Sequence, residues 1–171
     1  MDTLFGVLSA LENEVNMKSI ITLAISISAL VALWVYLSIG LPGLRLVPWI
    51  GFVAWATYFA AGGGWAAIVQ SLPPAVVGVL LTALTMFAVA KAGGGLVALV
   101  ALVALLAFAL VTMAWHKALA YTPAAFLGAA TYFGSGGHVD ESILFVIVSW
   151  IAGVAFGYLS QQLGARIAKP A

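Results

Sequence analysis

The chain has 171 residues, of which 65% belong to the apolar set and only 6% are charged, and its net charge is +1. An ordinary soluble domain is about half apolar and about a quarter charged. This composition therefore excludes a soluble enzyme, a nucleic-acid-binding domain and a disordered tail, and it predicts an integral membrane protein. Cysteine is absent, which excludes disulfides and thiolate metal sites.

Residues 1–18 form the first predicted element. Apolar residues recur there at the spacing of a helix face, at Leu4, Leu8, Leu11 and Val15. This periodicity predicts a short amphipathic helix over residues 3–16. Its polar face is acidic, which does not suit anionic lipid, and no basic region marks a secretory signal. We expect this helix to pack against the protein's own bundle or a neighbouring subunit.

Three apolar segments follow. Ser19–Gly40 is long enough to cross a hydrocarbon core of about 30 Å. Val47–Ala61 is short, with Pro48 at the expected helix start, and three glycines follow it. Trp65–Ala88 is long but contains Pro73 and Pro74. Two adjacent prolines remove two backbone donors, so they predict a break or a kink.

The second half of the chain repeats this order. Gly95–Trp115 is long, and Ala118–Phe133 is short and carries Pro123 near its start. A glycine-rich stretch ends that segment, and Ser142–Leu163 is long again. Residues 166–171 are predicted to form a cytoplasmic tail. The continuous apolar runs indicate an all-α polytopic bundle, because strands of a membrane barrel alternate apolar and polar residues.

The residues themselves also repeat. Phe52–Gly63 aligns with Phe126–Gly137 at an offset of 74, and seven of the twelve positions are identical. One residue of slippage later, Gly78-Val79 aligns with Gly153-Val154. This predicts one membrane domain over residues 19–165, built from two long-short-long repeats at about 17–90 and 91–165.

The duplication leaves two topologies open. If all six segments cross the membrane, the second repeat is inverted, a common construction of transporters and channels. If the short segments are re-entrant, four spans remain and the copies are parallel. Both arrangements place four basic residues inside and two outside, with both termini cytoplasmic, so the positive-inside rule does not separate them. We favour six spans because every segment is apolar enough to cross.

Three motifs carry a resemblance to a known family. They are Trp49–Ala60, Pro123–Gly137 and Phe156-Gly-Tyr158. Through them the sequence resembles the YcdZ-like family of small bacterial inner-membrane proteins, catalogued as a domain of unknown function, over most of residues 19–165. The resemblance implies a polytopic protein of the bacterial inner (plasma) membrane. It implies no activity, so no catalytic or binding residue is carried over.

No span centre holds a clear ionisable residue, which argues against a proton pump or a carboxylate-coupled transporter. Neutral polar groups would then line any pathway. The pathway-lining candidates are Thr57, Tyr58, Thr131, Tyr132, Gly62, Gly63, Gly136, Gly137 and Gln70. The alternative interpretation is structural: threonine bonds its own helix carbonyls, tyrosine sits at the membrane interface, and the glycines form turns.

The remaining polar cluster is His138, Asp140 and Glu141. Its residue types suit a weak metal site or an external pH sensor. A polar loop at the start of the last helix explains the two carboxylates more simply, through the helix dipole. We therefore predict no metal site and no other cofactor. Catalytic motifs are also absent from the sequence, so we expect no enzyme and no catalytic residue.

The leading functional hypothesis is a small channel or facilitator for a small neutral or weakly polar solute, with its pathway at the interface of the two repeats. The alternative is a non-transporting accessory subunit of a larger complex. Gly153–Gly157 is a G-x-x-x-G pattern that permits close helix contact. We expect the lipid bilayer, a homo-oligomer and a small neutral solute as partners, and no nucleic acid.

Overall fold

The computed structural model describes the backbone of residues 2–168 and the side chains of residues 16–168. Helix makes up 86% of the structure, and the described residues contain no strand, so the all-α class is confirmed. The α-helices are α1 (Asp2–Val35), α2 (Pro48–Ala60), α3 (Gly64–Lys91), α4 (Leu96–Thr112), α5 (Thr122–Gly134) and α6 (Ser142–Ala168). Turns of π or 3-10 helix lie at Tyr36–Gly40, Pro42–Leu44, Met113–Trp115 and Lys117–Leu119.

The first helix joins two predicted elements. α1 runs without interruption from Asp2 to Val35, so the segment expected to form an amphipathic helix and the first apolar segment share one helix. The side chains of residues 2–15 lie outside the described ones, so the amphipathic face stays a prediction.

The proline pair does not break α3. The helix continues through Pro73 and Pro74 to Lys91. Close contacts with α5 lie just beyond the pair, at Ala75 and Gly78. Prolines are tolerated inside membrane helices where neighbouring helices pack against them, and α5 packs against α3 just beyond this pair.

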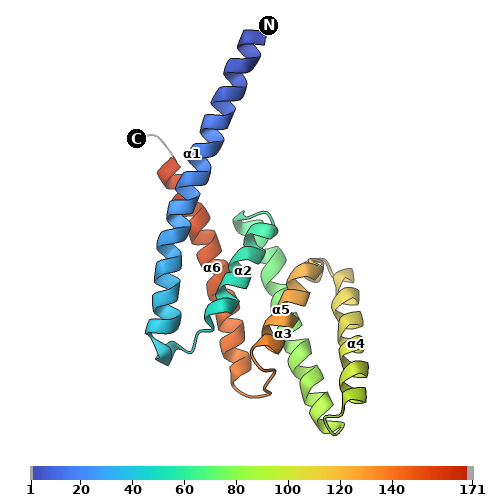
Figure 1. Cartoon of the computed structure of the whole chain (residues 1–171). Coiled ribbons are helices and arrows are strands. Elements are labelled where there is room, and N and C mark those ends of the chain that lie inside the picture. Colours follow the sequence, from blue (N-terminus) through green and yellow to red (C-terminus); the bar gives the residue numbers. More distant parts are fainter. Residues whose placement is uncertain (1, 169–171) are drawn as a thin grey trace.

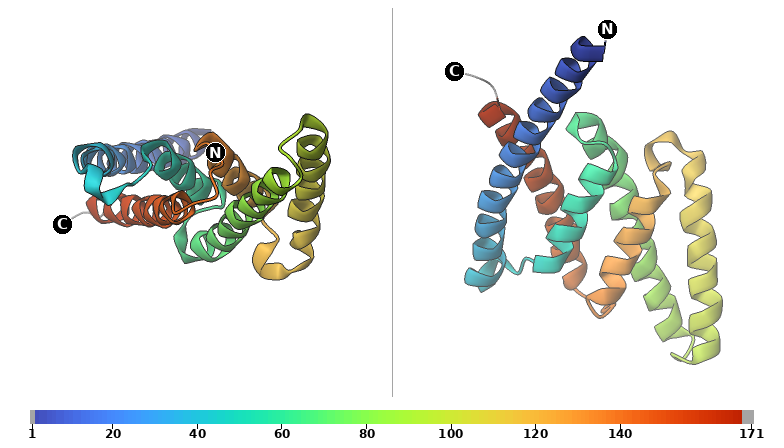
Figure 2. Two further views of the ribbon diagram at one scale, coloured as in Figure 1. Left: turned by 90° about the horizontal axis from the view of Figure 1, so that it is seen from below. Right: turned by 45° about the horizontal axis from the view of Figure 1, so that its top comes forward.

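The direction of the chain alternates from helix to helix (Figures 1 and 2). α1 and α6 are antiparallel, because the Ser26 hydroxyl donates to the Ser160 carbonyl and Gly164 lies against Leu23. α3 begins beside the end of α6, where the Gly64 N–H donates to Gln161 Oε1 at 2.8 Å. α1 and α3 are therefore parallel, and α2 carries the chain back between them.

Four stretches are long and apolar enough to cross a membrane: Asn16–Gly40, Gly64–Lys91, Leu96–Trp115 and Ser142–Ala168. α2 and α5 have 13 residues each, which corresponds to about 20 Å of helix. The two described ends of the chain lie at one end of the bundle, called the terminal end below (Figure 1).

Each short helix packs against the long helix of the other half. α2 lies along α6, and α5 lies along α3. A Cβ built on Gly78 would lie 2.1 Å from the Ala125 carbonyl oxygen, and one built on Gly153 would lie 2.4 Å from the Gly51 carbonyl oxygen. Both pairs therefore meet backbone to backbone, which only a residue without a side chain permits.

The two halves also bury the same positions. α2 buries Ile50, Gly51, Ala54, Trp55, Thr57 and Tyr58. α5 buries Ala124, Ala125, Gly128, Ala129, Thr131 and Tyr132, which are the same six positions at the offset of 74. On the long helices, buried Gly78 and Val79 correspond to buried Gly153 and Val154 at an offset of 75. The core is thus built from equivalent faces of the two halves.

Candidate functional site

The two threonines of the repeated motif lie inside the bundle. Thr57 and Thr131 are buried. The Thr57 hydroxyl donates to the Val53 carbonyl of its own helix at 2.7 Å, and the Thr131 hydroxyl donates to the Gly128 carbonyl at 2.8 Å. Thr131 Oγ1 also accepts the indole N–H of Trp150 at 2.8 Å. Both hydroxyls therefore serve contacts within the protein in this conformation.

The two tyrosines hold the turns that follow their helices. Tyr58 OH accepts the Gly64 N–H at 2.7 Å and donates to Gln161 Oε1. Tyr132 OH donates to the His138 carbonyl at 2.7 Å. Each hydroxyl bonds the backbone of the residue six positions further along the chain. The repeated motif thus fixes a helix end and the turn that follows it.

The glycine-rich turns have the backbone that glycine favours. Gly62 and Gly63 have φ values of 95° and 71°, and Gly136 and Gly137 have values of 96° and 61°. The N–H of the second glycine in each pair donates to the carbonyl of the motif tyrosine, at 3.2 Å in the first turn and 3.1 Å in the second. These are ordinary C-terminal helix caps.

The structure does not bring the two Thr-Tyr pairs together. Tyr58 contacts Gln161 near the end of α6, whereas Tyr132 contacts His138 just before α6 begins. At 1.5 Å per residue, those ends of α6 are roughly 30 Å apart. Four pockets are found around α3, α4, α5 and α6 among the described residues, and none of the four is lined by Thr57, Tyr58, Thr131 or Tyr132.

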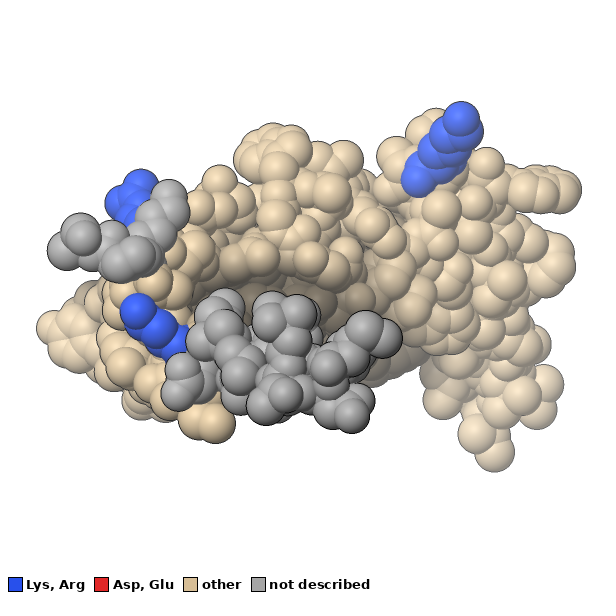
Figure 3. Space-filling view, turned by 90° about the horizontal axis from the view of Figure 1, so that it is seen from above, with Lys and Arg blue, Asp and Glu red and all other residues tan. Residues whose placement is uncertain are grey.

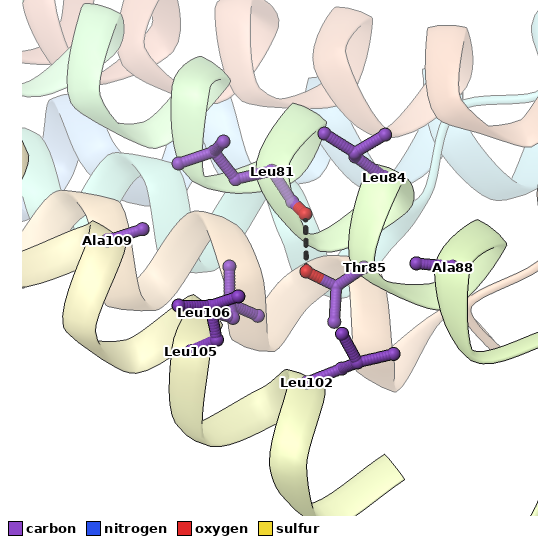
Figure 4. A pocket seen from close by; sticks show the side chains of 8 residues that line it. All are labelled: Leu81, Leu84, Thr85, Ala88, Leu102, Leu105, Leu106 and Ala109. Carbon is purple, nitrogen blue, oxygen red and sulfur yellow. Dashed lines mark hydrogen bonds between the residues drawn. The ribbon is translucent and has the colours of Figure 1, made fainter. Parts of the chain in front are cut away.

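Two apolar grooves flank α4. One, of about 240 Å³, lies between α3 and α4 and is bordered by leucines, alanines and Thr85 (Figure 4). The Thr85 hydroxyl donates to the Leu81 carbonyl of its own helix at 2.8 Å. The other groove, of about 180 Å³, lies between α4 and α5 and is wholly apolar. Neither groove offers a free polar group for a solute.

Two further pockets have polar residues in their walls. The Lys117 pocket, of about 420 Å³, is lined by Ala66, Val69, Gln70, Lys117, Ala118, Ala120 and Tyr121. The Arg45 pocket, of about 260 Å³, is lined by Arg45, Val47, Trp49, Ser135, Ser142, Phe145 and Val146. Of the predicted pathway-lining residues, Gln70 is the one that lines any of these four pockets.

The two polar pockets occupy equivalent places in the fold. Each lies between the connection that precedes a short helix and the first turns of the long helix against which that short helix packs. The Lys117 pocket lies at the terminal end, and the Arg45 pocket lies at the opposite end. Each draws its walls from both halves of the chain.

The charges around the two pockets differ. Arg45 Nη1 lies 2.7 Å from Glu141 Oε1, and its guanidinium lies 4.0 Å from the centre of the Phe145 ring. Hydrogen bonds from Ser142 hold the pKa of the neighbouring Asp140 carboxyl below its usual value. Lys117 forms no ion pair with any described side chain.

The polar loop before α6 has the capping role expected from its sequence. Asp140 Oδ1 accepts the Ser142 N–H at 2.8 Å, at the first turn of the helix. The described residues contain no group of three potential metal ligands.

Sequence reasoning missed the pocket residues Arg45, Lys117 and Tyr121 as a set. The available signal was the single basic residue in the connection before each short helix. That signal is weak by itself, because basic residues are common at the ends of membrane helices. The basic residue becomes informative only once the structure shows that its connection lies beside a helix of the other half.

A helical bundle with four stretches able to cross a bilayer places the chain, by length and composition, among polytopic membrane proteins. The chain belongs to the family described as a protein of unknown function, DUF1097, whose sequence model matches residues 24–165. The narrower resemblance to YcdZ-like proteins stays a prediction. Neither the curated proteins nor the solved structures contain a match to this chain.

Proposed function

We propose that this protein is a small facilitator of the bacterial inner membrane for a small neutral or weakly polar solute. Its pathway runs along the interface of two inverted repeats. The observation that carries the proposal is the pair of polar pockets, one at each end of the bundle, each built from both halves. Packed residues around buried Trp150 close the path between them in this conformation.

The directions of the helices support the proposal of six membrane crossings. Because α1 and α3 are parallel, the chain has to return across the bundle between them, and α2 is the segment that returns it. About 20 Å of helix is shorter than a hydrocarbon core of about 30 Å. Extending the crossing back past α2 to Arg45, a residue type whose long side chain can snorkel to the interface, makes up the difference.

Opposite helix directions in the two halves support an inverted repeat. α1, α2 and α3 run in the reverse sense to α4, α5 and α6 (Figure 1). The six buried positions shared by α2 and α5 support a common origin for the halves. Inverted repeats place solute sites at the repeat interface, where both polar pockets lie.

Charge distribution supports a cytoplasmic terminal end. Figure 3 views that end and shows basic side chains but no acidic one among the described residues. The described carboxylates, Asp140 and Glu141, lie at the other end with Arg45 and Lys91. An excess of lysine and arginine marks the cytoplasmic side of membrane proteins.

Cysteine labelling tests the number of spans, because the chain has no cysteine of its own. With six spans, Lys117→Cys faces the cytoplasm and Lys91→Cys faces outward. We expect a membrane-impermeant maleimide to label Lys91→Cys in intact cells and Lys117→Cys only in inverted vesicles. The reverse pattern is expected for four spans and would refute the six-span proposal.

Flux into proteoliposomes tests transport itself. We expect glycerol or urea to enter vesicles containing the protein at least about tenfold faster than protein-free vesicles, measured by stopped-flow light scattering. Ala120→Trp should remove most of this rate by filling the Lys117 pocket. Ala101→Trp, at an exposed position of α4, is the matched control and should leave the rate unchanged.

The outcome is decisive in either direction. If none of a panel of small neutral solutes enters faster than into protein-free vesicles, the facilitator proposal fails. Equal slowing by both tryptophan variants would also count against it, because the effect would then be independent of the pocket.

The second candidate is an accessory subunit, favoured by the exposure of α4. Val97, Leu96 and Phe108 are 84%, 74% and 67% exposed, and α4 contacts the rest of the bundle along one side only. Lipid, a second copy in a homo-oligomer or another subunit would each cover this face. Native mass spectrometry from mild detergent separates these cases, and a stable complex with a different protein would favour the accessory role.

A further inference from the structure

The two polar pockets differ in one respect that the repeat makes visible. In the Arg45 pocket the basic side chain already has a carboxylate partner, Glu141, which stands one residue before α6 begins. In the Lys117 pocket no described carboxylate reaches the basic side chain. The equivalent position on α3 shows why.

The sequence offset between α3 and α6, carried back from the glycine contacts, points to that position. The offset of 75 that pairs Gly78 with Gly153 also pairs Ala66 with Glu141. Ala66 is exposed and lines the Lys117 pocket. Where one half of the protein supplies a carboxylate to its basic residue, the other half supplies a methyl group beside a cavity of about 420 Å³.

The groups around this cavity are suited to an anion. Among its lining residues, Lys117 carries an ammonium, Gln70 a side-chain amide and Tyr121 a hydroxyl. Charge-assisted hydrogen bonds from ammonium to carboxylate or phosphate are among the stronger polar contacts in proteins. The two carboxylates whose side chains are described lie at the opposite end of the bundle.

We propose that the Lys117 pocket binds a carboxylate or phosphate group from outside the protein. The site lies in one of the two pockets on which the transport proposal rests, but anion binding there is measured without any transport assay. Its group belongs either to a small free anion or to the head group of an anionic lipid. Trp65 directly precedes Ala66, and Trp115 stands two residues before Lys117. These tryptophans are 69% and 97% exposed, and exposed tryptophans are typical of a membrane–water interface.

The experiment observes the lysines directly in the full chain. The protein is reductively methylated with ¹³C, which keeps the lysine charge, and placed in phosphatidylcholine nanodiscs. Acetate or inorganic phosphate is then titrated, with neutral acetamide as the isosteric control for acetate. Phosphatidylglycerol nanodiscs form the lipid arm. Lys117→Arg and Lys91→Arg assign the two signals.

We expect a saturable shift of the Lys117 methyl signal, with no comparable shift at Lys91 and none with acetamide. A response to acetate or phosphate identifies the free anion, and a response only to phosphatidylglycerol identifies the lipid head group. Ala66→Glu supplies the missing carboxylate, as Glu141 does for Arg45, and should weaken binding at least about tenfold. Ala66→Gln matches its size without charge and should weaken it much less.

Three outcomes would overturn the proposal. One is the absence of a saturable Lys117 shift with acetate, phosphate and phosphatidylglycerol alike. Another is an equal response of Lys91, which would indicate general screening by salt. The last is unchanged binding in Ala66→Glu, since a carboxylate at that position would then have no effect on the site.

Discussion

Replacing Gly78, in the middle of α3, with alanine should lower the thermal stability of the protein more than an alanine at Gly95, just before α4. The new Cβ would lie 2.1 Å from the Ala125 carbonyl oxygen, an atom of the α5 backbone that cannot rotate away. α3 and α5 would have to separate along their whole contact, which lies in the core of the bundle. Overpacking of this kind typically costs about 1–3 kcal/mol, and a backbone clash lies at the upper end.

The measurement is the midpoint of thermal unfolding in mild detergent, followed by the fraction that stays monodisperse. Gly95→Ala is the matched control, because a Cβ there meets nothing within 4 Å and φ is −74°. Gly153→Ala repeats the test in the other half, where the Gly51 carbonyl takes the place of Ala125. Equal midpoints for Gly78→Ala and Gly95→Ala would show that α3 and α5 are not in backbone contact.

Trp150→Ala should be the most destabilising single truncation in the core. Trp150 is fully buried, and its indole N–H donates to Thr131 Oγ1 at 2.8 Å. Truncating a buried tryptophan typically costs about 3–5 kcal/mol, because packing contacts are lost and a cavity remains. Trp150 also links α6 to α5 through Thr131, so its truncation would leave a cavity between the two polar pockets.

Trp115→Ala is the control for this truncation, because Trp115 is 97% exposed and its loss should leave the unfolding midpoint almost unchanged. Trp150→Phe keeps most of the ring but removes the N–H donor, so it should have an intermediate effect. An unfolding temperature of Trp150→Ala equal to that of the unaltered protein would show that Trp150 is not packed in a core between α5 and α6.

The sequence predicted the elements well because their signals are local. Each of the six apolar runs contains a helix, and prolines and glycines marked the ends of α2 and α5, but the separate helix predicted over residues 3–16 is continuous with the first run. The repeated Ala-Thr-Tyr-Phe motif was visible, but its role was not. A tyrosine hydroxyl that bonds the turn six residues later is a contact at the helix end, and its geometry depends on how the chain turns there.

The candidate site was predicted less well. Gln70 lies in a polar pocket, whereas Thr57 and Thr131 are buried with their hydroxyls bonded to their own helices. The expected juxtaposition of the two Thr-Tyr pairs required knowledge of which helices pack together. A short helix packs on the long helix of the other half, and the two tyrosine hydroxyls therefore lie near opposite ends of α6.

By itself, the sequence determined the membrane class, the six helices and the duplicated pattern, because composition and periodicity are properties of consecutive residues. Only the tertiary structure decided that α1 and α3 are parallel and that α3 continues through Pro73 and Pro74. It also decided that Glu141 pairs with Arg45, whereas no described carboxylate pairs with Lys117. Those features depend on contacts between segments more than 40 residues apart, such as Gly78 with Ala125 and Arg45 with Glu141. Close approach at Gly78 and Gly153 sets those contacts, and no local pattern specifies which backbone a glycine will meet.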